Sequence, residues 1–367
     1  MSARLGKISR PFLILTIILI VGGFFIFSSA SLGILVRNET EFSSVAFNQL
    51  FYGLFFGSLA CLFFARVDYH IWKKYSFAFF IISIILTLLV FAPVIGLEHG
   101  GAKRWIDLGF ISFQPAELLK IAFIIYFAAW LSGLKEKVGT FSWGLLPFLA
   151  FSGILGAILL AQPDTDTFAV IIFAALAMYI AGGAKWRHIL IILVSGLAVL
   201  AVLYFARPYI KQRIDIMIHP TMANQTSGYQ LNQSLIAVGS GQVWGRGFGQ
   251  SIQKFHYLPE PMGDSVFAVA AEEFGFVGAF TIVAVFILFG LEGLKISSGA
   301  SDNFGRLMSL GIVILIVSQA LINIGGMIGI LPLTGIPLPF ISQGGTALLI
   351  TLVEAGMMMS ISRSSKK

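Results

Sequence analysis

The sequence is poor in charge and almost without cysteine. Only 11% of its 367 residues are charged, whereas soluble domains typically carry about 25%, and its mean hydropathy is +0.91. This composition excludes an ordinary soluble protein and indicates a polytopic membrane protein. The single cysteine, Cys61, lies in an apolar run and cannot form an intrachain disulfide. The net charge of +7 would suggest nucleic acid in a soluble protein, but membrane proteins collect Lys and Arg in short loops on one side. We therefore expect no nucleic-acid partner.

Several sequence motifs are also missing. There is no Walker motif, no GxGxxG placed between a strand and a helix, and no zinc-type cluster of Cys and His. The five histidines are scattered and lack the spacing of metal ligands. We therefore expect no metal site and no nucleotide site on this chain. No internal repeat of the kind that marks many secondary transporters is evident either.

Ten apolar runs are long enough, or nearly so, to cross a bilayer core of about 30 Å as helices. They cover residues 12–34, 46–65, 76–95, 115–134, 143–161, 167–182, 188–206, 265–290, 307–330 and 343–361. The sequence therefore predicts an all-α polytopic membrane protein whose ten transmembrane helices form a single domain, 1–367. A large extracellular loop, about 207–264, is expected between helices 7 and 8.

The distribution of Lys and Arg predicts the orientation of these helices. With the N-terminus inside, cytoplasmic segments hold fifteen of the 24 basic residues, whereas the short outer loops hold only Arg37, Lys103 and Arg104. Both termini are therefore expected in the cytoplasm. The long loop and the other extended segments then lie on the outer side of the membrane.

One outer segment carries Lys103 and Arg104 beside Trp105. Interfacial tryptophan and snorkelling cations are common at membrane surfaces and offer a structural explanation. Outer loops are nevertheless depleted in such charge, so anion capture is the alternative. Arginine suits phosphate because its donors form a planar fork. We treat both cations as candidate substrate-binding residues.

Glu117 and Lys120 are ionisable residues inside a predicted span. Because they are three positions apart, they share one helix face and can form an ion pair. The pair either lets a polar helix sit inside the bundle or lines a cavity open to the outer leaflet. Pro115 suits the first turn of this helix, which places the pair about one turn below the outer surface.

The long loop contains a helix signal and a glycine-rich stretch. Residues 229–238 could form a short amphipathic helix at the interface. Five glycines between 239 and 249 permit tight turns and close approach of the backbone to a ligand, although flexibility is the plainer explanation. Together with Arg246 and Lys254, this stretch could cradle a phosphate or a sugar.

Asp264 ends the long loop and begins the eighth span, so it delivers a carboxylate to the boundary between water and bilayer. Taken alone, the favoured explanation is a helix N-cap, because Asp readily satisfies an unpaired N–H there. An acid at this boundary otherwise needs a partner or a function. Glu272 and Glu273, two turns deeper, are expected to be buried partners, and at least one of them is expected to stay protonated or paired.

The last outer turn, 331–346, has no charged residue but contains three prolines and three glycines. Irregular backbone at membrane depth is tolerated only against protein or a cavity. We therefore expect a re-entrant segment that walls a site.

In their order along the chain, these blocks resemble the SEDS family (shape, elongation, division and sporulation), the FtsW and RodA proteins of bacterial cell-wall synthesis. The resemblance spans the whole chain and rests on Lys103–Gly109, Phe113–Lys120, Ser227–Gly249, Tyr257–Glu260, Asp264, Asn323–Gly325 and Pro337–Ser342. The long-loop motifs resemble the FtsW branch more than the RodA branch.

The sequence departs from the family pattern at two places. The family commonly has His-Thr before the key acid, where Met262 and Gly263 stand here. Its usual Ser-Tyr-Gly-Gly near the end is replaced by Ser342-Gln343-Gly-Gly. The acid itself is retained, so its immediate partners are expected to differ.

The resemblance implies an inverting peptidoglycan glycosyltransferase of the cytoplasmic (inner) membrane that polymerises lipid II during septal cell-wall synthesis. It makes Asp264 the catalytic base. We expect Arg104 and Lys120 to orient the substrate or stabilise its leaving group, with Glu117 holding Lys120. No cofactor is required, although a divalent cation (Mg or Mn) could assist at the pyrophosphate. The expected partners are a class B penicillin-binding protein, which is a transpeptidase, and other divisome proteins.

Three alternatives stay open. A RodA-like polymerase would serve elongation and cell shape rather than division. A lipid II flippase or other transporter would need binding groups on both faces, whereas the candidate residues crowd the outer side. A scaffold would only position a transpeptidase.

Overall fold

The structure is a computed structural model that describes residues 8–35, 39–92, 95–99, 102–107, 112–218 and 227–364. Its helices are α1 (Arg10–Leu35), α2 (Glu39–Phe47), α3 (Gly57–Phe64), α4 (His70–Leu89), α5 (Pro115–Leu134), α6 (Leu146–Ala161), α7 (Thr165–Ala181), α8 (Trp186–Ala206), α9 (Pro208–Ile218), α10 (Ser227–Ser240), α11 (Gln253–His256), α12 (Val266–Gly299), α13 (Asn303–Met327) and α14 (Gly345–Arg363). Short π-helical and 3-10 segments, η1 (Asn48–Phe56), η2 (Lys135–Gly139) and η3 (Phe141–Leu145), complete the helical set.

Within the described ranges, nine helices are long and apolar enough to cross a membrane, and α7 is a shorter apolar helix. Each overlaps one of the ten runs predicted from the sequence, so the prediction of a polytopic helical membrane protein is confirmed. Three boundaries differ by six residues or more. The third predicted run, 76–95, is observed as His70–Leu89: the helix begins earlier, among polar residues, and it ends six residues before the predicted end. The eighth, 265–290, continues to Gly299.

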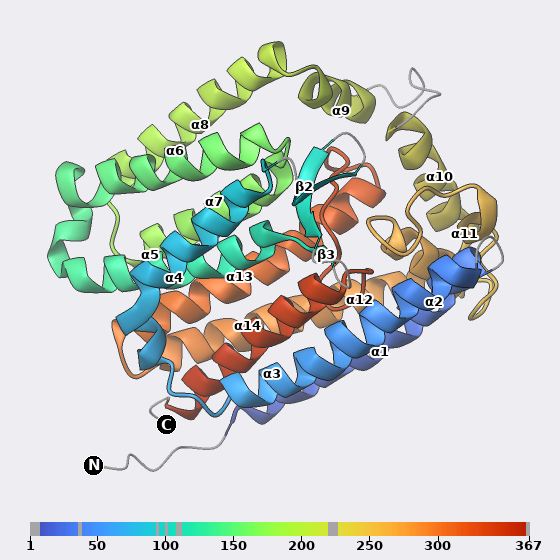
Figure 1. The fold of residues 1–367 in the computed structure, drawn as a ribbon, viewed down its shortest axis with the longest axis horizontal. Coiled ribbons are helices and arrows are strands. Elements are labelled where there is room, and N and C mark those ends of the chain that lie inside the picture. The colour runs from blue at the N-terminus through green and yellow to red at the C-terminus, as the bar shows by residue number, and fades with distance from the viewer. Residues whose placement is uncertain are drawn as a thin grey trace.

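The helices differ sharply in how much of their surface is covered. Helices α5, α13 and α14 are the most buried and form the centre of the bundle (Figure 1). Small residues such as Gly311 and Gly356 let neighbouring side chains and backbone approach these helices closely. Helix α8 is almost entirely exposed, and its Leu, Ile and Val side chains suit contact with lipid. Hydrophobicity alone does not distinguish the buried helices from the exposed ones, because α8 is more hydrophobic than α14.

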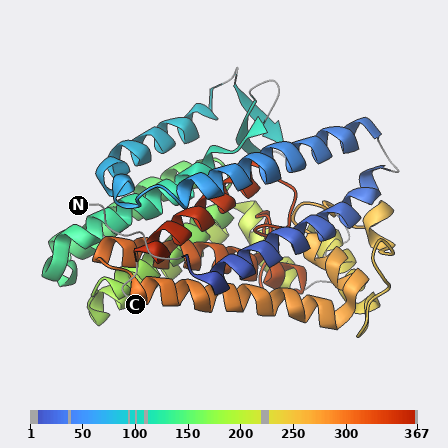
Figure 2. The ribbon, with the colours of Figure 1, turned by 90° about the horizontal axis from the view of Figure 1, so that it is seen from below.

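The polar segments gather at one end of the bundle. Strands β1 (Gly96–His99), β2 (Ala102–Asp107) and β3 (Ser112–Phe113) form an antiparallel sheet in the order β1-β2-β3. This sheet and helices α9 to α11 lie opposite the start of α1 and the end of α14 (Figures 1 and 2). Helix α10 confirms the short helix predicted over 229–238. The sheet and α9 were not predicted, and His219, with the other residues of 219–226, lies outside the described part of the chain.

A kink in α12 receives the glycine-rich part of the long loop. Gly275 has φ +65°, which breaks the helical backbone and frees its hydrogen-bonding groups for other partners. The loop takes up these groups through four backbone hydrogen bonds: Arg246 to Glu272, Gly247 to Glu273, Phe276 to Gln242 and Val277 to Val243. The loop is therefore docked into the bundle, because buried backbone groups must find partners.

Candidate active site

Asp264 lies just before α12, at the end of the bundle that carries the polar segments. The N-cap of α12 is Ser265, and no side chain caps the helix. Within the described ranges, no hydrogen bond reaches the Asp264 carboxylate. Helix capping, which the sequence favoured for this residue taken alone, is therefore wrong.

The surroundings of Asp264 change its acidity. Burial is the largest influence and raises the pKa of this carboxyl from its ordinary 3.8 to about 7. The negative charges of Glu260 and Asp166 raise the pKa further, while Arg213 and Arg104 oppose the shift. A carboxyl with this pKa can accept a proton near neutral pH, which is the property that a general base requires.

Two guanidinium groups face Asp264 across Gly335. A Cβ atom added to Gly335 would lie 3.6 Å from Asp264 Oδ2 and 3.8 Å from both Arg104 Nη1 and Arg213 Nη2. The glycine thus keeps open the space onto which one acid and two cations converge. Gly335 belongs to the uncharged segment 331–346, which fits the prediction that this segment walls a site.

Arg213 comes from α9 and was missed by the sequence analysis. Its Nη1 forms an ion pair with Asp166 Oδ2 at 2.7 Å. The same oxygen accepts a hydrogen bond from the Gly335 backbone N–H at 2.9 Å. The pair therefore ties α9 to the wall of the site. Arg213 carries little signal in the sequence, because long loops contain cations whether or not these bind a substrate.

Arg104 is held by backbone carbonyls at the end of α6. Its Nε donates to Gln162 O at 3.2 Å, and its Nη2 donates to Pro163 O. Asp164 follows and is buried, and burial raises the pKa of its carboxyl while Arg104 opposes that shift. Lys103, the neighbour of Arg104 on β2, is exposed to solvent. Because side chains alternate along a strand, the structure separates these two candidate cations.

Glu117 and Lys120 form the predicted pair. Their side chains are buried and lie 2.9 Å apart. Lys120 Nζ also donates to Gln319 Oε1 at 2.7 Å, and Gln319 Nε2 donates to Pro337 O at 2.9 Å. Through Gln319, the pair is therefore linked to the segment that carries Gly335. Direct contact of Lys120 with a substrate stays a prediction.

Arg246 and Lys254 are engaged elsewhere. Lys254 is fully buried, and its Nζ lies 2.7 Å from Glu273 Oε1 and 2.9 Å from Ser29 Oγ on α1. Arg246 Nε lies 3.4 Å from Glu272 Oε1. Both glutamates are thus buried and paired with a cation, whereas the sequence led us to expect a protonated or paired state for at least one of them. The two cations hold the loop on α1 and α12, and the structure does not bring them to Asp264.

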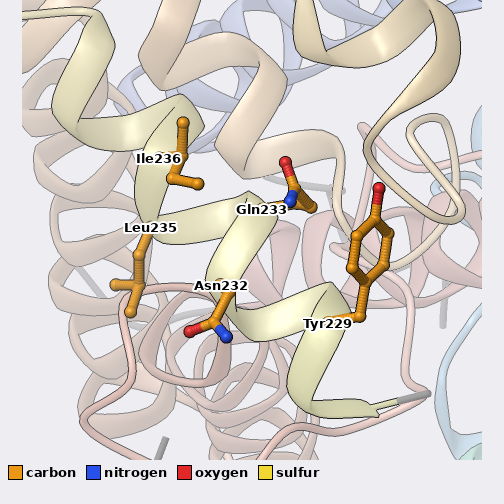
Figure 3. Close-up of a pocket in the computed structure, with 5 residues that line it drawn as sticks. All are labelled: Tyr229, Asn232, Gln233, Leu235 and Ile236. Atoms are coloured by element: carbon orange, nitrogen blue, oxygen red, sulfur yellow. The ribbon is translucent and has the colours of Figure 1, made fainter. Parts of the chain in front are cut away.

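An open pocket of about 620 Å³ lies along α10 (Figure 3). It is lined by Tyr229, Asn232, Gln233, Leu235 and Ile236. The same helix is joined to the candidate site because Gln230 Nε2 donates to Ser265 Oγ at 3.0 Å. The pocket therefore offers amide and phenol groups on the helix that contacts the residue after Asp264.

Comparison with known proteins identifies the family. A model of the FtsW/RodA/SpoVE family of cell cycle proteins matches residues 9–367. The chain belongs to this family. The predicted SEDS resemblance is thus confirmed, and the chain is a multi-pass protein of the cytoplasmic membrane.

Two relatives of this FtsW/RodA/SpoVE protein illustrate its similarity to named members of the family. Stage V sporulation protein E of Bacillus subtilis (strain 168) is 36% identical over 366 residues, which cover 98% of this chain and 99% of that protein. A probable peptidoglycan glycosyltransferase FtsW of Geobacter sp. (strain M18) is 37% identical over 297 residues, 81% of each chain.

Solved structures show the same fold. A chain of a peptidoglycan synthase complex aligns with a TM-score of 0.79 at 24% identity, covering 98% of both chains. The rod shape determining protein RodA of Thermus thermophilus aligns with a TM-score of 0.71 at 23% identity, again covering 98% of both chains. This SEDS chain therefore has the helical architecture of those proteins.

The described side chains around Asp264 do not match the ligand set of a metal site. In the part of the chain that the structure describes, no group of three or more His, Cys, Asp and Glu side chains could hold a metal ion. Near Asp264, the carboxylate of Asp166 is already engaged by Arg213 and by the Gly335 N–H. The residues present therefore do not form a metal-binding set.

Proposed function

We propose that this protein is a peptidoglycan glycosyltransferase that polymerises lipid II at the outer face of the cytoplasmic membrane. One observation carries the proposal: the Asp264 carboxylate, whose pKa is raised to about 7, faces the guanidinium groups of Arg104 and Arg213 across Gly335. A base opposite two cations matches a reaction that removes a proton from a hydroxyl and releases a pyrophosphate. The FtsW relatives bear the name of this activity.

The proposed reaction joins two sugars with inversion. The 4-hydroxyl oxygen of one sugar attacks the anomeric carbon of the other, and the bond from that carbon to the pyrophosphate oxygen breaks. Asp264 accepts the hydroxyl proton, and the lipid pyrophosphate leaves with the bonding electrons. An α-linked donor then gives a β-1,4 bond, because attack occurs in line with the departing group.

Arg104 and Arg213 would stabilise the leaving pyrophosphate. Arginine binds phosphate oxygens through two parallel donors, and each guanidinium keeps N–H groups beyond those used by its protein partners. Arg104 is fixed by backbone carbonyls and Arg213 by Asp166, so both are positioned before substrate arrives. The described residues around Asp264 do not form a metal-binding set. In the proposed reaction, Arg104 and Arg213 therefore supply the positive charge that the pyrophosphate needs.

The pocket on α10 would hold a sugar of the glycan. Asn232, Gln233 and Tyr229 supply amide and phenol groups that match sugar hydroxyls, and Leu235 supplies an apolar surface. This assignment gives the reaction a site for a second sugar on the helix that contacts Ser265.

The finer biological role follows the sequence resemblance. We propose that both termini lie in the cytoplasm, that the protein acts in septal synthesis, and that its partner is a class B penicillin-binding protein. The likeness to a chain of a peptidoglycan synthase complex supports a synthase partner. A flippase would need binding groups at both ends of the bundle, and the convergence of acid and cations at one end argues against that alternative.

The test is a polymerisation assay on the purified protein with its transpeptidase partner and labelled lipid II. We expect polymer from the wild type and almost none from Asp264→Asn. Glu260→Gln is the matched control, because it removes a neighbouring exposed carboxylate and should keep activity. Full activity of a correctly folded Asp264→Asn variant would contradict the proposal, as would translocation of lipid II without polymer.

A further inference from the structure

The main chain just before α12 is held at three consecutive carbonyl groups. Met262 O accepts a hydrogen bond from the Gln343 N–H at 2.7 Å. Gly263 O accepts from Ser342 Oγ at 2.7 Å. Asp264 O accepts from Asn323 Nδ2 at 2.9 Å. Every carbonyl from 262 to 264 therefore has a donor from a distant part of the chain.

The side chains that donate are themselves fixed. Asn323 is fully buried on α13, and its Nδ2 also donates to Ile336 O at 2.9 Å. The Ser342 hydroxyl also accepts from the Leu338 N–H at 2.8 Å. Asn323 thus joins the segment before α12 to the segment around Gly335, on which Arg104 and Arg213 converge.

The backbone of 342–344 is anchored from another side by Gln49. Its Nε2 donates to Ser342 O at 3.2 Å, and its Oε1 accepts from the Gly344 N–H at 2.9 Å. Ser342 therefore cannot shift without breaking contacts to η1 as well. The two donor side chains, Asn323 and Ser342, are thus each held by at least one further partner outside the segment 262–264.

We propose that Asn323 and Ser342 are positioning residues that aim the Asp264 carboxylate by clamping its main chain. The inference rests on the proposed function, in which Asp264 is the base. No hydrogen bond in the described structure holds the carboxylate itself, so its direction follows from the backbone at 262–264. A base must reach the reacting hydroxyl to within a hydrogen bond, and a small displacement is costly.

The clamp binds the main-chain carbonyl oxygens of residues 262–264. The side chains at positions 262 and 263 do not contribute to it. This explains how Met262 and Gly263 can stand where the SEDS family commonly has His and Thr. Met262 is buried and packs in the core, while Gly263 contributes only backbone. The acid keeps its place because its frame is made by other segments.

The first experiment measures polymerisation kinetics. Asn323→Ala and Ser342→Ala should each lower kcat by about 10- to 100-fold, as expected for a misplaced catalytic group, and leave KM nearly unchanged. Asn323→Asp should be worse than Asn323→Ala, because a carboxylate would face two carbonyl oxygens. Ser318→Ala is the matched control on α13, since among the described residues its hydroxyl donates to Leu315 O of its own helix and to no other group.

The second experiment reports position without using activity. Cys61 is the only cysteine, so Cys61→Ala combined with Asp264→Cys gives a single thiol at the position of the acid. Its labelling rate with a small thiol reagent should change several-fold when Asn323→Ala is added and should stay constant with Ser318→Ala. Unchanged labelling in folded protein, or unchanged kcat, would overturn the clamp. Full activity of Asp264→Asn would instead contradict the proposed function. The labelling experiment would still test whether Asn323 positions residue 264, because it does not depend on activity.

Discussion

Replacing Asp264 with asparagine is expected to stabilise the protein at alkaline pH while it removes the activity. Burial, together with the charges of Glu260 and Asp166, raises the pKa of this carboxyl from 3.8 to about 7. Between these two values the folded protein binds a proton that the unfolded chain has released. The folded state therefore loses stability as the pH rises through this window, and the full cost is present above about pH 7.

The size of this cost follows from the shift. One pKa unit corresponds to about 1.4 kcal/mol, so a shift of roughly three units gives an upper bound of about 4 kcal/mol. Asp264 keeps some contact with solvent, which reduces the figure to about 1–3 kcal/mol once screening is included. Asparagine has nearly the same shape and carries no charge, so it avoids this cost at every pH.

Thermal denaturation in detergent measures the effect. The Tm of Asp264→Asn should exceed that of the wild type at pH 8. The difference should be much smaller at pH 4, where the folded wild-type carboxyl is neutral and the unfolded one is only partly ionised, and it should vanish below about pH 3. The wild-type kcat/KM should rise with pH and reach half its maximum near pH 7. Glu260→Gln should move that midpoint to lower pH, because it removes a nearby negative charge. A Tm difference that is the same at pH 4 and pH 8 would refute the reasoning.

Three further predictions concern neighbouring features. Arg213→Ala should lower kcat/KM by about 10- to 100-fold through lost stabilisation of the leaving group, whereas Lys103→Ala should change it little, and steady-state kinetics of polymerisation compare the two. Lys254→Met leaves a buried carboxylate unpaired and should destabilise the protein by about 3–5 kcal/mol, which denaturation would show as a lower Tm. Gly245→Ala should lower the Tm, because Gly245 has φ +79° and an added Cβ would collide with the backbone of α12 at Glu273. Gly239→Ala should not lower it, because a Cβ there meets no other atom within 4 Å.

The membrane architecture was predictable because its physical signal is local. An apolar run of about 20 residues has to cross the bilayer as a helix, and each predicted run corresponds to an observed one. The boundary of α4 was misplaced because charged side chains at a helix end can extend to the surface and hide where the helix begins. The β1–β3 sheet was not predicted, since in the described residues it consists of three short strands within one connecting segment, which leave little pattern in the sequence.

The site was predicted in part. Asp264 was singled out as the base by its match to the SEDS motif, since taken alone it suggested a helix cap. Arg104 was singled out because cations are scarce in short outer loops, and the structure brings both residues to Gly335. Arg213 was not, because one cation among several in a long loop carries no signal until the fold brings it to Gly335. Arg246 and Lys254 were assigned to substrate because a sequence does not show which carboxylates a cation will meet.

The glycine-rich stretch shows the same limit. Its glycines suggested a loop that cradles a ligand, yet Gly245 is needed for close approach to the backbone of α12. The matching break in α12 is at Gly275, which lies inside a predicted apolar span and gave no warning of a kink. Loop and helix depend on one another here, and only the folded chain brings them together.

In the proposed site, the groups that orient Asp264 are different from those that set the pKa of its carboxyl. A carboxylate that accepts several hydrogen bonds is well oriented, but its pKa falls and it becomes a weaker base. In this protein Asn323 and Ser342 donate to main-chain carbonyls and not to the carboxylate. If Asp264 is the base, as proposed, this arrangement orients the residue and leaves its carboxylate oxygens for a substrate hydroxyl. Moving those donors onto the carboxylate would keep the acid in place and weaken it as a base.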